Sequence, residues 1–178
     1  HKAMYEYARD DYRDIETVVD LSETKTCADI GGANGALIGH LINHHRNVSF
    51  TVFDKQDQRH RVAAESPYVE GDFFEVIPPL GDTYLLSRVL HDWKEESARI
   101  IIQNCFLSLP SGGNLYVIEN DLSKLGDCGH LLSLNMMSVC ESFERKLEQY
   151  VELLTAVGFV IDSVNNHNQL LVIKAIKL

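Results

Sequence analysis

A glycine-rich segment, DIGGANG, carries the strongest chemical signal in the sequence. Gly31, Gly32 and Gly35 follow Asp29 within it, between a short apolar run and a helical pattern. Glycines permit positive φ and let a ligand lie against the main chain at a helix N-terminus. Nineteen residues beyond Gly35, a second apolar run ends at Asp54, where a carboxylate can accept hydrogen bonds from ribose hydroxyls. The pattern predicts a nucleoside-containing ligand; the plainer alternative is a tight turn followed by a solvated Asp54.

The order of the glycines differs from that of two familiar phosphate-binding loops. No Gly-Lys-Ser/Thr follows, so the segment is not a P-loop, and glycines at 31, 32 and 35 do not fit the dinucleotide pattern G-x-G-x-x-G. The acid before the glycines can instead meet a cationic group. S-adenosylmethionine carries a sulfonium and an ammonium where a dinucleotide carries pyrophosphate, so Asp29 favours that cofactor.

Apolar runs that alternate with helical patterns must position these groups. Strands are predicted over residues 26–30, 48–53, 83–86, 114–119, 159–164 and 170–176, and helices over 5–19, 34–44, 95–109 and 147–157. Such alternation is typical of an α/β fold with a doubly wound, mostly parallel sheet. The short connection at 165–168 predicts an antiparallel C-terminal hairpin.

Length and composition limit the class of protein. A chain of 178 residues with 45% hydrophobic and 24% charged side chains can form one domain, spanning 1–178, with a substantial core. The formal charge, 16 − 26 = −10, argues against sequence-independent binding to nucleic acid or to anionic membranes. No apolar run approaches the ~20 residues of a membrane span. The first residues resemble no signal peptide and do not begin with Met, so we expect a piece of a longer chain.

The cysteines indicate a reducing compartment. The four cysteines, Cys27, Cys105, Cys128 and Cys140, form no CxxC pair. We therefore expect reduced thiols in a cytoplasmic protein rather than a zinc site, and no metal ion.

Several further motifs follow one another along the chain. They occupy residues 71–74 (GDFF), 84–93 (YLLSRVLHDW), 109–113 (LPSGG), 134–137 (LNMM), 144–145 (ER) and 156–159 (AVGF). In this order they resemble the small-molecule O-methyltransferases of the caffeate and hydroxyindole type, from about residue 3 to residue 178. The resemblance implies a Rossmann-like methyltransferase sheet of seven strands and the cofactor S-adenosylmethionine, which leaves as S-adenosylhomocysteine. The family's N-terminal helical domain, which forms its homodimer and closes part of the substrate pocket, has no counterpart in these residues.

The resemblance also implies which residues hold the cofactor. The glycine loop would cradle its methionine part and Asp54 its ribose. Asp72 and Phe73 would flank the adenine, with Trp93 nearby. Ser87 stands where the family usually has a lysine that touches the cofactor, and Ala33 replaces a third glycine.

His91 in the Leu-His-Asp-Trp motif matches the family's catalytic base. By the same resemblance its partners are Glu119 and Glu144, and Asn135 and Met136 line the pocket for the small-molecule acceptor. An imidazole with an ordinary pKa of about 6.5 can take the proton of a phenolic hydroxyl as the methyl group is transferred, without a metal.

Two other functions compete with this hypothesis. The chain could be a relative that binds S-adenosylmethionine for other tailoring chemistry; the residues Ser142, Phe143 and Lys146 around Glu144 depart from the family pattern. It could also be a non-catalytic module that binds a partner, with His91 as a packed structural histidine. Binding of S-adenosylhomocysteine and turnover on hydroxylated aromatics separate the three hypotheses.

Overall fold

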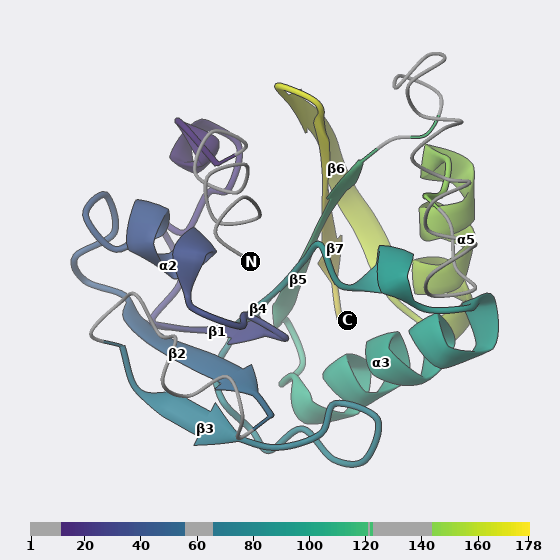
Figure 1. Cartoon of the computed structure of the whole chain (residues 1–178), viewed down its shortest axis with the longest axis horizontal. Coiled ribbons are helices and arrows are strands. Elements are labelled where there is room, and N and C mark those ends of the chain that lie inside the picture. Colours follow the sequence, from purple (N-terminus) through teal and green to yellow (C-terminus); the bar gives the residue numbers. More distant parts are fainter. Residues whose placement is uncertain (1–11, 56–65, 121, 123–143) are drawn as a thin grey trace.

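The computed structural model describes residues 12–55, 66–120, 122 and 144–178. The described chain forms a seven-stranded sheet in the order β3-β2-β1-β4-β5-β7-β6 (Figure 1). Its strands are β1 (Thr26–Ile30), β2 (Ser49–Asp54), β3 (Tyr68–Glu70), β4 (Thr83–Ser87), β5 (Asn114–Asn120), β6 (Val160–His167) and β7 (Leu170–Ile176). The helices are η1 (Ile15–Thr17), α2 (Ala36–Leu41), η3 (Leu90–Asp92), α3 (Glu95–Ser108) and α5 (Leu147–Val157).

The strand order confirms the predicted doubly wound, mostly parallel sheet. β1 to β5 pair in parallel, whereas β7 runs antiparallel to both β5 and β6. The chain proceeds outward from β1 through β2 and β3, then returns to the other side of β1 with β4. Open α/β sheets bind ligands in the crevice beyond the carboxyl ends of the strands at such a reversal. The glycine loop after β1 and the segment after β4 both lie at this point.

Both faces of the sheet are covered, which explains the nearly continuous apolar run of β4. Tyr84 and Leu86 belong to the core cluster that includes residues of α3 and α5, and Leu85 belongs to the cluster that includes residues of η1 and α2. All three side chains are fully buried. Figure 1 shows α3 and α5 on one side of the sheet and α2 and η1 on the other.

The glycines set two of the helix boundaries. α2 begins later than predicted, because Gly35 has φ 72° and Ala33 has φ 45°, so the backbone is not helical until Ala36. α5 has the predicted bounds and ends at Gly158, whose φ of 115° an L side chain rarely adopts.

Three other elements differ from the expectation by more than one residue at an end. Of the helix expected over 5–19, residues 12–19 show only the short η1, and residues 1–11 lie outside the described part. β3 was missed because its three residues are half-buried or exposed and show no apolar alternation. The hairpin is tighter than predicted, since β6 continues to His167 and the turn is made at Asn168, with φ 54°. None of the described helices is long and apolar enough to span a bilayer.

Candidate active site

The glycine loop leaves the end of β1 in a conformation that side chains would obstruct. Gly31 has φ 73° and its N–H donates to the Phe53 carbonyl over 2.8 Å, which ties the loop to β2. A Cβ on Gly31 would lie 2.9 Å from Val89 Cγ2, and one on Gly32 would lie 2.6 Å from the Asp29 carboxylate. Both glycines are therefore required for the backbone to approach its neighbours. Because Val89 immediately precedes η3, the same contact brings the loop next to the segment that carries His91.

Asp29 is a buried carboxylate at the end of β1. It is only 2% exposed, and its Oδ1 has no hydrogen-bond partner. Burial, followed by repulsion from Asp54, raises the pKa of Asp29 to about 7. A buried carboxylate oxygen without a partner fits a cationic donor such as an ammonium group, which would supply both the hydrogen bond and the compensating charge.

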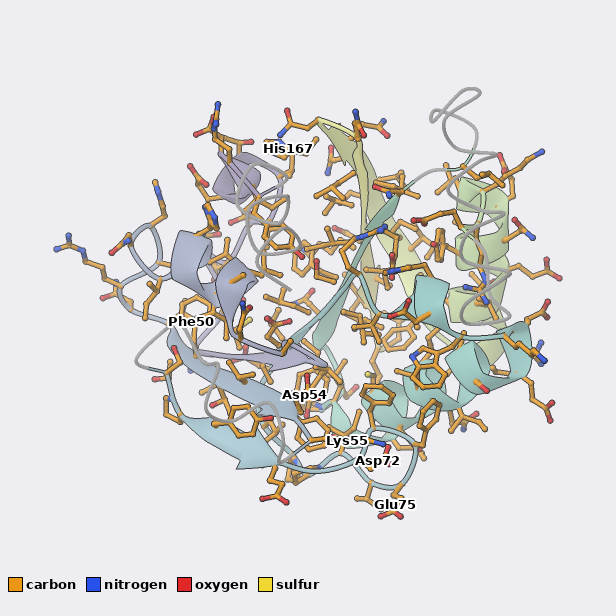
Figure 2. All side chains as sticks on the ribbon, in the orientation of Figure 1. Phe50, Asp54, Lys55, Asp72, Glu75 and His167 are labelled. Atoms are coloured by element: carbon orange, nitrogen blue, oxygen red, sulfur yellow. The ribbon has the colours of Figure 1, made fainter. Side chains whose placement is uncertain are left out.

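Asp54 and Asp72 hold the chain at the ends of β2 and β3. Asp54 Oδ2 accepts a hydrogen bond from Ala33 N–H over 2.8 Å, and its Oδ1 accepts one from Lys55 N–H over 2.6 Å. Lys55 Nζ lies 3.1 Å from Asp72 Oδ2. The backbone N–H of Phe74, assisted by Lys55, holds the pKa of Asp72 below its ordinary value. Figure 2 shows Asp54, Lys55 and Asp72 gathered in one region, with Phe50 at the opposite end of β2.

Three aromatic rings form a cluster beside these acids. The Phe74 ring lies 4.6 Å from Trp93 and 4.9 Å from Phe73, and Phe73 lies 6.1 Å from Trp93, all edge to face. Asn104 on α3 donates a hydrogen bond to the Phe73 carbonyl over 2.8 Å. The fold therefore brings together Phe73 and Trp93, the two aromatic residues singled out in the sequence, and places Phe74 between them.

His91 is fixed by a carboxylate on the neighbouring strand. Its Nδ1 lies 2.9 Å from Glu119 Oε2, and Glu119 Oε1 accepts the backbone N–H groups of Val89 and Leu90 over 2.9 and 2.7 Å. His91 Nε2 lies 3.3 Å from Asp92 Oδ1. Burial favours the neutral imidazole, but Glu119 outweighs it and raises the pKa of His91. Glu119 is fully buried, yet His91 and Arg88 outweigh burial and hold its pKa below the ordinary value. The pair is an imidazole oriented by an ionised carboxylate.

Glu144 joins this group through a residue to which the sequence analysis gave no role. Arg88 Nη1 donates to Glu144 Oε1 over 3.0 Å and approaches Glu119 Oε2 at 3.4 Å. Glu144 Oε1 also accepts from Asn120 Nδ2 over 3.0 Å. Arg145 donates to the backbone carbonyls of Leu90 over 2.7 Å and of Trp93 over 2.6 Å, so it holds the turn around His91. The position of Arg88 next to Ser87 and of Arg145 next to Glu144 was the available signal.

Ser87 ends β4 and is paired with another residue that the sequence analysis missed. Tyr12 Oη lies 2.7 Å from Ser87 Oγ, and the phenol is buried. Burial is the main cause that raises the pKa of Tyr12, and the charges of Asp29, Arg88 and Glu119 also act on it. Tyr12 therefore lies beside Ser87 at the end of β4, near enough to Asp29, Arg88 and Glu119 for their charges to act on it. No local pattern marks it, because 75 residues separate it from Ser87.

The remaining expected residues do not add to this geometry. Asn135 and Met136 lie outside the described residues, as do Cys128 and Cys140. Cys27 and Cys105 are buried free thiols. Within the described part of the chain, no group of three His, Cys, Asp or Glu side chains is placed to hold a metal ion.

The sequence matches known proteins over most of its length. The O-methyltransferase domain family matches residues 2–160. Acetylserotonin O-methyltransferase of Gallus gallus is 34% identical over 158 residues, which cover 83% of this chain and 46% of that protein. The 2,7-dihydroxy-5-methyl-1-naphthoate 7-O-methyltransferase of Streptomyces carzinostaticus is 32% identical over 162 residues, or 85% of this chain and 48% of that protein. The chain thus spans about half the length of these curated relatives.

Solved structures agree with the sequence match. Human N-acetylserotonin methyltransferase in complex with S-adenosylmethionine has a TM-score of 0.90 and 29% identity, over 99% of this chain and 54% of that one. An O-methyltransferase from neocarzinostatin biosynthesis, in complex with S-adenosyl-L-homocysteine and 1,4-dihydroxy-2-naphthoic acid, has a TM-score of 0.88 and 28% identity, over 99% of this chain and 56% of that one. Fold, motif order and the family match therefore agree: this chain belongs to the O-methyltransferase domain family.

Proposed function

We propose that this chain is the catalytic domain of an enzyme that transfers a methyl group from S-adenosylmethionine to a hydroxyl of a small aromatic acceptor, with His91 as general base. The observation that carries the proposal is the pairing of His91 Nδ1 with Glu119 over 2.9 Å, in the segment that contacts the glycine loop through Val89. The relatives support the acceptor class, because their names specify acetylserotonin and a dihydroxynaphthoate.

The described residues fit the cofactor. Asp29, with its unpartnered Oδ1, would take the ammonium group, and Asp54 would accept hydrogen bonds from the ribose hydroxyls. Asp72 and the aromatic cluster of Phe73 and Trp93 would border the adenine. S-adenosylmethionine, when bound, supplies a methyl group on a sulfonium, and its sulfur keeps the electron pair of the broken bond as a neutral thioether. Gly31, Gly32 and Gly35 let the backbone approach this group.

His91 supplies the proton transfer. A phenolic hydroxyl has a pKa of about 10 and is a weak nucleophile at neutral pH. With Nδ1–H donating to Glu119, the proton of the acceptor hydroxyl passes to Nε2 as the oxygen–methyl bond forms. Glu119 then stabilises the imidazolium and keeps the ring in the required tautomer.

Other residues would complete the site. Ser87 ends β4 and is bonded to Tyr12, and by resemblance Asn135 and Met136 would contact the acceptor. The same resemblance supports a homodimer of the whole protein, which light scattering would test.

The test is a comparison of His91→Gln with wild type in the full chain. General-base assistance is worth ~10²–10⁴ in rate, so turnover of hydroxylated aromatics such as N-acetylserotonin and 1,4-dihydroxy-2-naphthoic acid should fall by about that factor. Affinity for S-adenosylhomocysteine, measured by calorimetry, should stay close to wild type. His44→Gln is the matched control, because the His44 side chain is 53% exposed and contacts Glu16 rather than the site.

Three outcomes would contradict the proposal in different ways. Near-normal turnover in His91→Gln would mean that catalysis depends on positioning the methyl donor and the acceptor and not on a proton transfer to His91. Cofactor binding without turnover on any hydroxylated aromatic would favour the alternative tailoring chemistry. Absence of cofactor binding in the wild-type chain would favour a partner-binding module.

A further inference from the structure

Arg88 lies between two buried carboxylates, one of which also binds His91. Its Nη1 is 3.0 Å from Glu144 Oε1 and 3.4 Å from Glu119 Oε2, and both glutamate side chains are 0% exposed. His91 Nδ1 is 2.9 Å from the same Oε2 of Glu119. One oxygen atom is therefore shared between a permanent cation and the group proposed as the base.

The charges of this cluster require a cation. Burial of an ionised carboxylate is strongly unfavourable unless it is paired. Arginine is charged at every accessible pH, whereas histidine can gain or lose its proton near neutrality. If His91 were the sole cation facing Glu119 and Glu144, it would hold its proton as their counter-ion. A general base must be neutral before it reacts, so the cluster needs a positive charge that does not come from His91.

The backbone of Arg88 gives an independent sign of function. Its φ is 56°, in the left-handed region that non-glycine residues seldom occupy. Its N–H still donates to the Ile118 carbonyl over 2.9 Å, a backbone hydrogen bond that follows Ser87, the last residue of β4 paired with β5. Backbone strain of this kind persists where the surrounding contacts over-determine it, and it is concentrated at functional sites. Here the contacts are the two carboxylates.

The other charged groups near the imidazole act in both directions. Glu119 from β5 and Asp92 from η3 favour the imidazolium, whereas Arg88 opposes it. In the described residues, the remaining titratable groups facing this cluster are Glu144 and Arg145 before α5, Tyr150 on α5, and Tyr12. Arg145 bonds to backbone carbonyls, and the pKa values of the two buried tyrosines are raised, mainly by desolvation, so neither phenol is ionised near neutrality.

We propose that Arg88 is a positioning residue that serves as the standing counter-ion of Glu119 and Glu144, and thereby leaves His91 free of that duty and available as a base. The proposal rests on the proposed function in giving His91 a catalytic task. The charge relation itself is independent of cofactor, acceptor and turnover, and can be measured without them.

The direct test follows the His91 ring by NMR through a pH titration of the full chain, with His91→Gln used to assign its signal. In Arg88→Met the midpoint should rise, with proton affinity increasing about tenfold or more, because one nearby positive charge is lost. Arg88→Lys keeps the charge without the planar fork and should return the midpoint most of the way to wild type. Asp92→Asn removes a carboxylate 3.3 Å from Nε2 and should shift the midpoint in the opposite direction.

A charge-matched pair of variants is used as well, because Arg88→Met leaves a buried carboxylate unpaired and can fail to fold for that reason. Glu144→Gln is compared with the double variant Arg88→Met/Glu144→Gln, in which one positive and one negative charge are removed together. The midpoint should be higher in the double variant than in Glu144→Gln. An equal or lower midpoint in folded protein, in either comparison, would overturn the role of Arg88. Normal turnover in His91→Gln alongside the expected midpoints would instead overturn the proposed function and leave the charge relation standing.

Discussion

Two ionisable side chains of the site, Asp29 and His91, have their charge set by their neighbours. Burial and the nearby Asp54 raise the pKa of Asp29 to about 7, which favours the neutral acid. For His91, burial favours the neutral ring, and the carboxylate of Glu119 outweighs it and favours the imidazolium. In the free protein near neutrality, Asp29 is therefore partly protonated, and the pKa of His91 lies above that of an ordinary imidazole. The roles proposed for these two side chains require Asp29 to be ionised and His91 to be neutral.

The state of Asp29 predicts that cofactor binding depends on pH. A bound ammonium group favours the ionised carboxylate, so affinity for S-adenosylmethionine should weaken as pH falls below about 7, by up to tenfold per pH unit. Asp29→Asn should bind weakly at pH 8 and show little change down to pH 6. Calorimetry across this range checks both; equal affinity of wild type at pH 6 and pH 8 would contradict the assignment. The stability of the free protein should also depend on pH. Because the native pKa of Asp29 is raised, its contribution to the free energy of unfolding decreases as pH rises from about 4 to about 7.

Asp54 should contribute to cofactor affinity through its carboxylate. Asp54→Ala removes a charged acceptor and should weaken binding of S-adenosylhomocysteine by about 1.5–3 kcal/mol. It also removes the bond to Ala33 N–H, so Asp54→Asn, which keeps an acceptor, should lose less. Glu75→Ala is the matched control, since this exposed acid lies beyond Asp72 (Figure 2). Unchanged affinity in Asp54→Ala, measured by calorimetry, would exclude Asp54 from the site.

At the scale of elements, the residues of the candidate site lie in short connections after the strands, and long helices support these connections. The loop after β1, the turn after β4 and the end of β5 bring Gly31, Val89 and Glu119 together. α3 and α5 cover the sheet beside them, and Arg145, just before α5, donates two hydrogen bonds to the turn around His91. The position of α5 therefore affects the site directly.

The end of α5 should depend on a glycine. Gly158 has φ 115°, and a Cβ there would lie 3.2 Å from Phe106, so Gly158→Ala should lower the free energy of unfolding by about 1–2 kcal/mol or more. Gly39 lies within α2 with no atom within 4 Å of an added Cβ, so Gly39→Ala should raise it by about 0.5–1 kcal/mol. Urea denaturation of the two variants measures both changes. Equal effects in the same direction would refute the assignment of Gly158 as a left-handed cap.

At the scale of the whole molecule, one sheet lies between two apolar clusters, and its strands contribute side chains to both. Leu85 and Leu86 are consecutive residues of β4 that point into opposite clusters, and both are 0% exposed. Since each strand contributes to both layers, loss of packing on one face removes support from the other. We therefore expect a single cooperative unfolding transition.

The single tryptophan allows this cooperativity to be tested. Trp93 packs against the cluster that contains Leu86, on the opposite face from Leu85. Leu85→Ala should cost about 2–5 kcal/mol and shift the Trp93 fluorescence transition and the circular dichroism transition together. Val76→Ala is the control: its side chain is 73% exposed, and it should change stability by about 0.5 kcal/mol or less. A fluorescence transition that stays at the wild-type urea concentration would indicate independent faces.

Patterns within single segments were sufficient for much of the fold. The apolar run of β4, the periodicity of α5 and its terminal Gly158 predicted those elements, because burial on both faces, helical amphipathicity and positive φ each leave a local signature. The glycine loop, Asp54 and His91 were singled out from residue type, spacing and family resemblance, and the fold brings the loop and the His91 segment into contact through Val89. β3 has no such signature and was found only in the structure.

The protonation states of the site residues depend on contacts that form only in the tertiary structure. Arg88 and Glu144 form an ion pair across 56 residues, and Tyr12 bonds to Ser87 across 75, so no local pattern relates them. The left-handed backbone of Arg88 is equally absent from its sequence context, since arginine has no preference for positive φ. The pKa of Asp29 rises because the folded chain removes water from it and places Asp54 nearby. Sequence specifies which ionisable groups exist, but desolvation and distance decide their charge, and both arise only when remote segments pack together.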